Sequence, residues 1–334
     1  MTPVLIFLII IALCFDFLNG VHDSSNIVAT MISSRAIKPQ VALIMTALAE
    51  FSGPFIFGVA VATTIGSEIV APEHINMNVL IAALLSAITW NILTWILGIP
   101  SSSSHALIGG IIGAIVISVG FKELELTGIL KIALTLFVSP IIGFLAGWLV
   151  ANIISMVSWK ATPGINKVFK RLQISTSLAL ALSHGTNDAQ KTMGIITLGL
   201  VISGVEKSFN VPFWVILICA LAIAIGTSVG GWRLIKTLGS KFYKIRPVHG
   251  FAAQTASAAV ILTASLIGGP VSTTQVVSTS IMGVGAAERL SKVRWGVAGE
   301  IASAWLFTIP STAILAAGFY WFITHGVPAI IKLF

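Results

Sequence analysis

The sequence Gly98-Ile99-Pro100-Ser101-Ser102-Ser103-Ser104 joins two apolar arms that lie within residues 77–119. A second sequence, Gly268-Gly269-Pro270-Val271-Ser272-Thr273-Thr274, joins two apolar arms within residues 248–287 in the same way. Proline prevents a preceding helix from continuing, but it suits the first turn of the helix that follows. Each sequence therefore predicts a re-entrant hairpin with its turn at the proline and with hydroxyl-bearing residues at the start of the second arm.

The composition excludes a water-soluble chain. Apolar residues make up 56% of the 334 residues and charged residues only 9%, and the mean hydropathy is +1.01. Soluble proteins carry about 25% charged residues, so a soluble enzyme, a disordered chain and a nucleic-acid-binding protein are excluded, although the net charge is +8. Because a transmembrane helix needs roughly 20 apolar residues, the sequence predicts an all-α polytopic membrane protein with about 10–12 transmembrane segments.

The charged residues predict the orientation of the chain. Lys and Arg gather in four short segments, at residues 35–38, 160–171, 233–246 and 289–294. The positive-inside rule places such segments in the cytoplasm. The loop over residues 66–76 carries Glu68 and Glu73 without Lys or Arg, so it is expected to face outward. The resulting order of spans places both termini on the extracytoplasmic side of the plasma membrane.

The chain also contains a weak internal repeat. Gly20-Val21-His22-Asp23 aligns with Gly185-Thr186-Asn187-Asp188, and each motif is followed by one of the two proline-led sequences. The loop after the first motif is basic, whereas the loop after the second carries Glu206, so the halves are predicted to have opposite orientations. Many secondary transporters use such an inverted repeat for alternating access. The predicted units are a first repeat over residues 1–155, a cytoplasmic basic connector over residues 156–171 and a second repeat over residues 172–334.

Asp23 and Asp188 lie in apolar segments that Gly and polar residues interrupt, which predicts two broken helices, over residues 3–34 and 172–203. A carboxylate at mid-membrane costs about 2.5–3.5 kcal/mol and is a functional candidate by default. Carboxylate and amide oxygens beside freed carbonyls suit a monovalent cation such as sodium. The alternative is a structural role, in which an Asp caps a broken helix or Asp188 forms an ion pair with Lys191. The candidate cation ligands are Asp23, Asn26, Glu50, Asn187 and Asp188.

The hydroxyl residues after the two prolines are expected at the N-termini of half-helices. Unpaired N–H groups and the positive end of the helix dipole attract anions there, so two such tips that meet would bind a small oxyanion. Alternatively, the hydroxyls bond their own helix carbonyls or permit close helix packing. The candidate anion ligands are Ser101, Ser102, Ser103, Ser104, Ser272, Thr273 and Thr274, and His105, Gln254 and Gln275 are candidates for lining the site.

A metal carrier is a rival interpretation. His184 and Asp188 are four residues apart and could share one helix face, a spacing that suits a divalent metal. Asn19 replaces the histidine in the first half, and no Cys or further His joins the pair. A divalent-metal carrier or a passive channel therefore stays an alternative.

The paired motifs resemble those of the inorganic phosphate transporter (PiT) family, whose members are sodium- or proton-coupled phosphate permeases. Gly185-Thr186-Asn187-Asp188 matches the family's G-x-N-D motif, and Gly20-Val21-His22-Asp23 matches it with His22 in place of Asn. The resemblance implies a transporter, not an enzyme, that imports phosphate with sodium as the coupling ion and needs no other cofactor. It also implies a homodimer and a phosphate site in which Asn187 and Lys191 are further ligands. His22 is expected to line this site. A proton-coupled phosphate permease or a sulfate permease stays open.

Overall fold

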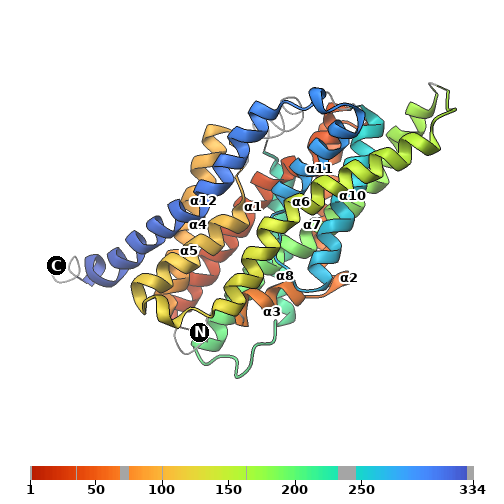
Figure 1. Ribbon diagram of the computed structural model, residues 1–334. Coiled ribbons are helices and arrows are strands. Elements are labelled where there is room, and N and C mark those ends of the chain that lie inside the picture. Colours follow the sequence, from red (N-terminus) through yellow and green to blue (C-terminus); the bar gives the residue numbers. More distant parts are fainter. Residues whose placement is uncertain are drawn as a thin grey trace.

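The computed structural model describes residues 2–34, 36–67, 75–99, 101–162, 164–231 and 246–328, and its regular elements are helices (Figure 1). Part of the evidence for orientation falls outside these ranges, since Arg35, Glu68, Glu73 and residues 233–245 are not described. Pro100, at which the first hairpin was predicted to turn, also lies outside the described residues.

The helices are long and follow one another with short connections. The first half contributes α1 (Pro3–Ser33), α2 (Pro39–Phe57), α3 (Ala60–Ser67), α4 (Met77–Leu97), α5 (Ser103–Ser118) and α6 (Leu126–Val157). The second half contributes α7 (Ile165–Ile202), α8 (Phe213–Val229), α10 (Pro247–Leu266), α11 (Thr273–Glu288) and α12 (Trp295–Trp321). Short helical turns complete the described elements: η2 (Phe121–Glu123), η3 (Leu290–Lys292) and η4 (Phe322–Gly326).

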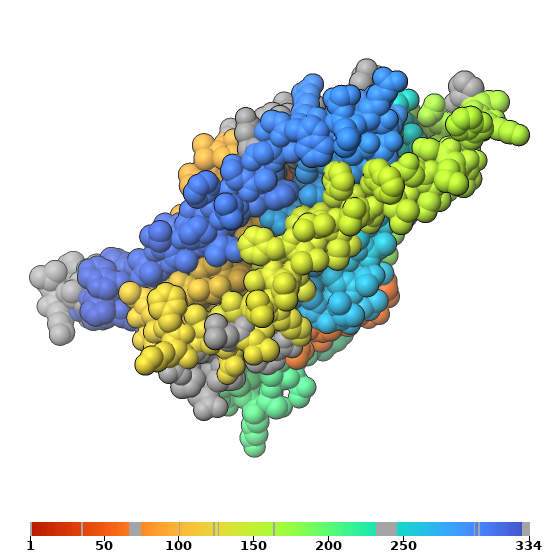
Figure 2. Space-filling model, viewed as in Figure 1, coloured from red at the N-terminus to blue at the C-terminus, as the bar shows by residue number. Residues whose placement is uncertain are grey.

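The exterior of the bundle is apolar, as a lipid environment requires. Within the described ranges, five helical stretches are long and apolar enough to cross a membrane: Pro3–Ser33, Pro39–Phe57, Met77–Leu97, Thr127–Val157 and Ile301–Gly326. Helices α6 and α12 run across the face seen in Figure 2, and large apolar side chains such as Leu145 and Ile314 are exposed on them. Helices satisfy their own backbone hydrogen bonds and can therefore cross a bilayer. The predicted class, an all-α membrane protein, is confirmed.

Helices α1 and α7 are continuous through the two Asp motifs, so the prediction of two broken helices is wrong. The glycines of these motifs serve helix packing instead. A Cβ atom on Gly20 would overlap the carbonyl oxygen of Ile223 in α8, and one on Gly185 would overlap that of Glu50 in α2. Small residues let helix backbones approach closely in membrane proteins. The motifs therefore mark close helix crossings, at which the helices do not unwind.

Two helical hairpins form where they were predicted, α4–α5 and α10–α11. Gly98 and Gly268 have φ values of 68° and 74° in the two turns, a left-handed conformation that glycine adopts without steric cost. The turns meet in the interior of the bundle, where the Ser104 hydroxyl donates a hydrogen bond to the carbonyl oxygen of Val271 at 3.0 Å. The hairpins thereby bring residues of both halves into one buried region.

Each hairpin packs on a long helix of the other half. Helix α5 contacts α12, and α11 contacts α6; similarly, α1 contacts α8, and α2 contacts α7. Each of these contacts between the halves therefore has an equivalent contact in which the corresponding helices of the two halves have changed places.

Candidate functional site

The second arms of the two hairpins begin with the same cap. The Ser102 hydroxyl accepts a hydrogen bond from the backbone N–H of His105 at 3.1 Å, and the Ser272 hydroxyl accepts one from that of Gln275 at 3.3 Å. The His105 and Gln275 side chains lie 3.4 Å apart between their Nε2 atoms. Two helix N-termini, each with a partial positive charge, are thus together in the interior.

The carboxylate of Asp23 in α1 accepts hydrogen bonds from both hairpins. Its Oδ2 lies 3.2 Å from the Ser103 hydroxyl, and its Oδ1 lies 2.8 Å from the Thr274 hydroxyl. The carboxylate of Asp188 in α7 accepts a hydrogen bond from the Thr273 hydroxyl at 2.8 Å. Both Asp side chains are fully buried. The predicted carboxylates and the predicted hydroxyls therefore form one cluster.

Asn26 and Lys191 occupy equivalent places, each three residues after its Asp. The Asn26 Nδ2 donates to Asp23 Oδ1 and to the Thr274 hydroxyl, both at 2.9 Å. The Lys191 ammonium donates to Asp188 Oδ1, to the Ser104 hydroxyl and, at 3.1 Å, to the carbonyl oxygen of Val271. Each side chain links the Asp of its own half to the hairpin of the other half.

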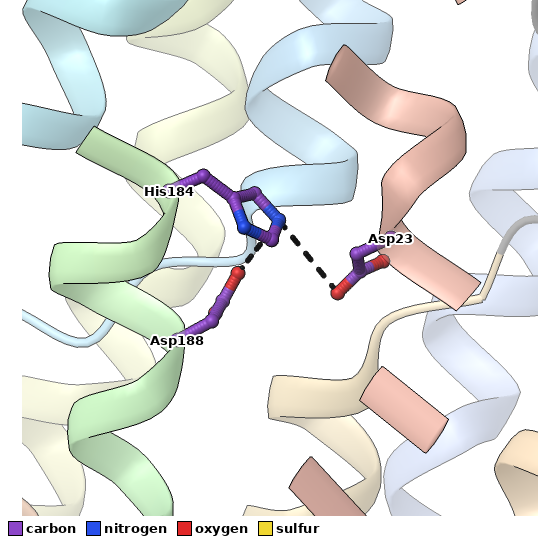
Figure 3. Close-up of side chains that lie close together, drawn as sticks. All are labelled: Asp23, His184 and Asp188. Carbon is purple, nitrogen blue, oxygen red and sulfur yellow. Dashed lines mark ion pairs between the residues drawn. The ribbon is translucent and has the colours of Figure 1, made fainter. Parts of the chain in front are cut away.

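His184 lies between the two carboxylates (Figure 3). Its Nε2 is 2.9 Å from Asp188 Oδ2 and 4.0 Å from Asp23 Oδ2, and its Nδ1 is 2.8 Å from Glu50 Oε1. Glu50 therefore reaches Asp188 through the imidazole. The sequence placed His184 only in the metal alternative and not in the main site. The signal that could have found it is the four-residue spacing to Asp188, which puts both side chains on one helix face.

The same three side chains could hold a metal ion. Asp23, His184 and Asp188 each offer one ligand atom, and these atoms lie within 4.8 Å of one another. Carboxylate oxygen and imidazole nitrogen are ligands for several divalent metals. The ammonium of Lys191 already contacts Asp188, and a second cation on that carboxylate would be repelled by it.

Two of the candidate ligands brace the hairpins. The Ser101 hydroxyl donates to the Thr94 hydroxyl at 2.8 Å, within the α4–α5 hairpin. The Asn187 Nδ2 donates to the Ser265 hydroxyl at 2.9 Å and to the Gly269 carbonyl oxygen at 3.2 Å. These contacts hold the turns in place, and they do not involve either Asp.

Of two further residues expected to line the site, Gln254 lies away from both Asp side chains and His22 contacts Asp23. The Gln254 side chain accepts a hydrogen bond from Thr176 and donates one to Thr30, both at 2.8 Å, so it connects α10 with α7 and α1 without contact to either Asp. The His22 Nδ1 lies 3.2 Å from Asp23 Oδ1. Next to His22 is a cavity of about 170 Å³ that Asn91 also lines, so His22 stands between this cavity and Asp23.

The fold and this cluster define a polytopic membrane transport protein, with buried charges and helix N-termini in a lipid-facing helical bundle. The model of the phosphate transporter family matches residues 19–164 and 157–316. The chain therefore belongs to the phosphate transporter family, as the resemblance implied, and it is a transporter and not an enzyme.

Relatives agree over almost the whole chain. A probable low-affinity inorganic phosphate transporter of Rhizobium meliloti is 47% identical over 94% of this chain and 95% of that protein. A protein of the same description from Bacillus subtilis is 46% identical, over 93% and 95%. Among solved structures, one described as a sodium-dependent phosphate transporter matches with a TM-score of 0.89 and 26% identity, over 97% of this chain and 99% of that one.

Proposed function

We propose that the chain imports inorganic phosphate by symport with a cation, with sodium as the coupling ion, by alternating access. The observation that carries the proposal is the meeting of two helix N-termini and their hydroxyls with two buried carboxylates. Helix N-termini bind phosphate, and paired carboxylates bind cations. The structural neighbour is described as a sodium-dependent phosphate transporter, which supports sodium as the coupling ion.

Phosphate would bind at the tips of the two hairpins. The hydroxyls of Ser103, Thr273 and Thr274 donate to carboxylates, and that of Ser104 donates to a carbonyl oxygen. A hydroxyl donates one hydrogen bond at a time, so a phosphate oxygen at the tips would take these donors from the carboxylates. Ser102 and Ser272 hold the helix ends in place through their caps.

Cation binding then follows from electrostatics. Two unit charges of the same sign at 4 Å repel by about 4 kcal/mol at an effective dielectric constant of about 20. Phosphate beside Asp23 meets this repulsion unless a cation neutralises the carboxylate, whereas Asp188 already forms an ion pair with Lys191. Each ligand therefore raises the affinity for the other, and the effect is reciprocal. This mutual dependence is the coupling that symport requires.

The proposed sodium site centres on Asp23. Among the described residues, the Oδ1 of Asn26 has no hydrogen-bond partner although its side chain is buried. Its neighbour Asp23 supplies carboxylate oxygens, so the two residues offer the hard oxygen ligands that sodium binds. Glu50 acts on the other carboxylate through His184, and Asn187 supports the second hairpin.

Alternating access would use the two predicted repeats, residues 1–155 and 172–334, joined by the connector 156–171. The exchanged packing of α5 on α12 and of α11 on α6 supports a symmetric relation between them.

The plasma-membrane location with both termini outside, and the homodimer, stay proposals that rest on the sequence and on the resemblance.

Proton coupling is the second candidate. The observation that favours it is the row of close contacts between titratable side chains from Glu50 through His184 to Asp188, at 2.8 and 2.9 Å. Histidine is the side chain whose charge changes near neutral pH, and such a row could carry a proton across the site.

Reconstituted protein would distinguish these functions. We expect radiolabelled phosphate to accumulate in proteoliposomes under an inward sodium gradient, without inhibition by excess sulfate. Accumulation under a proton gradient alone would replace sodium by protons as the coupling ion. A lack of accumulation under both gradients would contradict phosphate symport and favour the metal or sulfate alternatives.

The hairpin hydroxyls give a second test. Thr274→Val keeps the side-chain shape but removes the donor to Asp23, and a lost hydrogen bond to a charged group costs about 1.5–3 kcal/mol. We therefore expect the KM for phosphate to rise by about 10-fold or more. Thr308→Val is a matched control, because the Thr308 hydroxyl bonds the Ala304 carbonyl of its own helix and lies outside the cluster. Equal KM values for both variants would contradict a role of Thr274 in phosphate binding.

A further inference from the structure

We infer that Lys191 takes the place of a coupling cation at Asp188, so that this half of the site carries a permanent cation where the other half binds a mobile one. The inference rests on the proposed function, and it deepens it by assigning the number of cations that accompany each phosphate. It begins from the equivalence of Asn26 and Lys191.

Two contacts of each side chain correspond. Asn26 connects Asp23 to Thr274, and Lys191 connects Asp188 to Ser104. In the sequence repeat, Ser104 and Thr274 occupy the same position in the two hairpins. A neutral amide and an ammonium therefore occupy the same place in the two halves.

The surroundings of the Lys191 ammonium are those of a bound cation. An ammonium has three donors and no acceptor, and three oxygens accept from it: a carboxylate of Asp188, the hydroxyl of Ser104 and the carbonyl of Val271. Lys191 is 1% exposed. This shell of carboxylate, hydroxyl and carbonyl oxygens is the kind that would hold a sodium ion, but a covalent tether supplies the charge.

Among the described residues, no Lys or Arg side chain forms an ion pair with Asp23. Asn26 uses its Nδ2 for Asp23 and Thr274, and its Oδ1 stays without a partner among the described residues. In the described part of the chain, the basic side chains within 4.0 Å of the Asp23 carboxylate are His22, at 3.2 Å, and His184, at 4.0 Å. His184 is shared with Asp188. The negative charge of Asp23 therefore requires a mobile cation when phosphate binds, whereas that of Asp188 does not.

The inference predicts that substitutions at these two positions change the number of mobile cations that accompany each phosphate. Lys191→Asn gives the second half the amide of the first half and removes the tethered charge, so Asp188 should then recruit one more mobile cation. Asn26→Lys does the reverse at Asp23 and should remove one. The double exchange N26K/K191N should restore the original number, and Lys191→Arg, which keeps the charge, should leave the number unchanged.

The number of cations per phosphate can be measured in proteoliposomes at zero membrane potential. A tenfold sodium gradient is imposed, and the phosphate gradient at which the net phosphate flux stops is determined. Each additional coupled sodium ion multiplies this limiting gradient by about 10, equivalent to about 1.4 kcal/mol. We expect K191N to raise the limit about tenfold over the wild type and N26K to lower it about tenfold.

A binding measurement keeps the test valid if a variant does not transport. Sodium that binds only the folded protein raises its stability with concentration. We expect the unfolding temperature of purified K191N to increase more steeply with sodium than that of the wild type, and that of N26K to increase less.

Failure of the inference differs from failure of the proposed function. If the wild type accumulates phosphate with sodium but K191N has the same limiting gradient and the same sodium-dependent stabilisation, Lys191 does not replace a cation. If the wild type itself does not couple phosphate to sodium, the proposed function fails, and an equal sodium response of the two purified proteins would overturn the inference as well.

Discussion

Asp23→Asn is expected to remove sodium-driven phosphate uptake almost completely while the protein stays folded. The asparagine Oδ1 can still accept a hydrogen bond from Thr274, and its Nδ2 can donate one to the Ser103 hydroxyl, so the contacts of the hairpin tips with α1 persist. It cannot neutralise a cation, however, and the coupling between cation and phosphate is lost. Coupling free energies of 1–3 kcal/mol correspond to effects of about 5–150-fold, and we expect the initial rate at saturating sodium to fall by about 100-fold.

The measurement is the initial uptake rate as a function of sodium concentration, together with the unfolding temperature of the purified variant. Thr308→Val, outside the cluster, is the control for nonspecific loss of activity. A D23N protein with the sodium dependence of the wild type would exclude Asp23 from the cation site.

Asp188→Asn should instead lose stability. The carboxylate of Asp188 contacts the Lys191 ammonium, and both side chains are buried. Removal of one partner of a buried ion pair costs about 3–5 kcal/mol, because the remaining charge has no compensation. His184 loses the carboxylate that lies 2.9 Å from its Nε2 at the same time. We expect a much lower unfolding temperature than that of D23N, and little folded protein in the membrane.

A double variant tests whether the loss of stability comes from the uncompensated charge of Lys191. Asp188→Asn together with Lys191→Gln removes both charges, and we expect it to recover most of the stability although not the transport. Unfolding temperatures measured in the same detergent compare D188N, the double variant and D23N. Equal losses for D188N and D23N would show that Lys191 is not held by Asp188 in the way the structure indicates.

The membrane class and the hairpins could be predicted because their signals are local. Apolar length, the turn glycines and the Ser102 and Ser272 caps act within a few residues of the chain. The presence of an Asp motif and a hydroxyl tip in each half could also be predicted from the repeat, whereas the contact of Asp23 with Thr274 could not. The roles of these side chains as ligands stay predictions.

The rest of the cluster depends on contacts between distant segments. Gly20 and Gly185 were interpreted as breaks, but whether a glycine interrupts a helix or lets a neighbour approach depends on which helix packs there. The contact of His184 with Glu50 joins α7 to α2, and no spacing in the sequence encodes it. The directions of the Ser101 and Gln254 side chains likewise follow from how each helix is rotated in the bundle.

The exchanged packing of the hairpins has a consequence for biosynthesis. The α4–α5 hairpin packs on α12, which begins at Trp295 and is therefore made long after the hairpin. We expect the interior contacts of the α4–α5 hairpin to be completed only after the last helices of the chain have been made. We therefore expect that neither half folds on its own, and that a chain cut in the connector regains its structure only when both fragments are present.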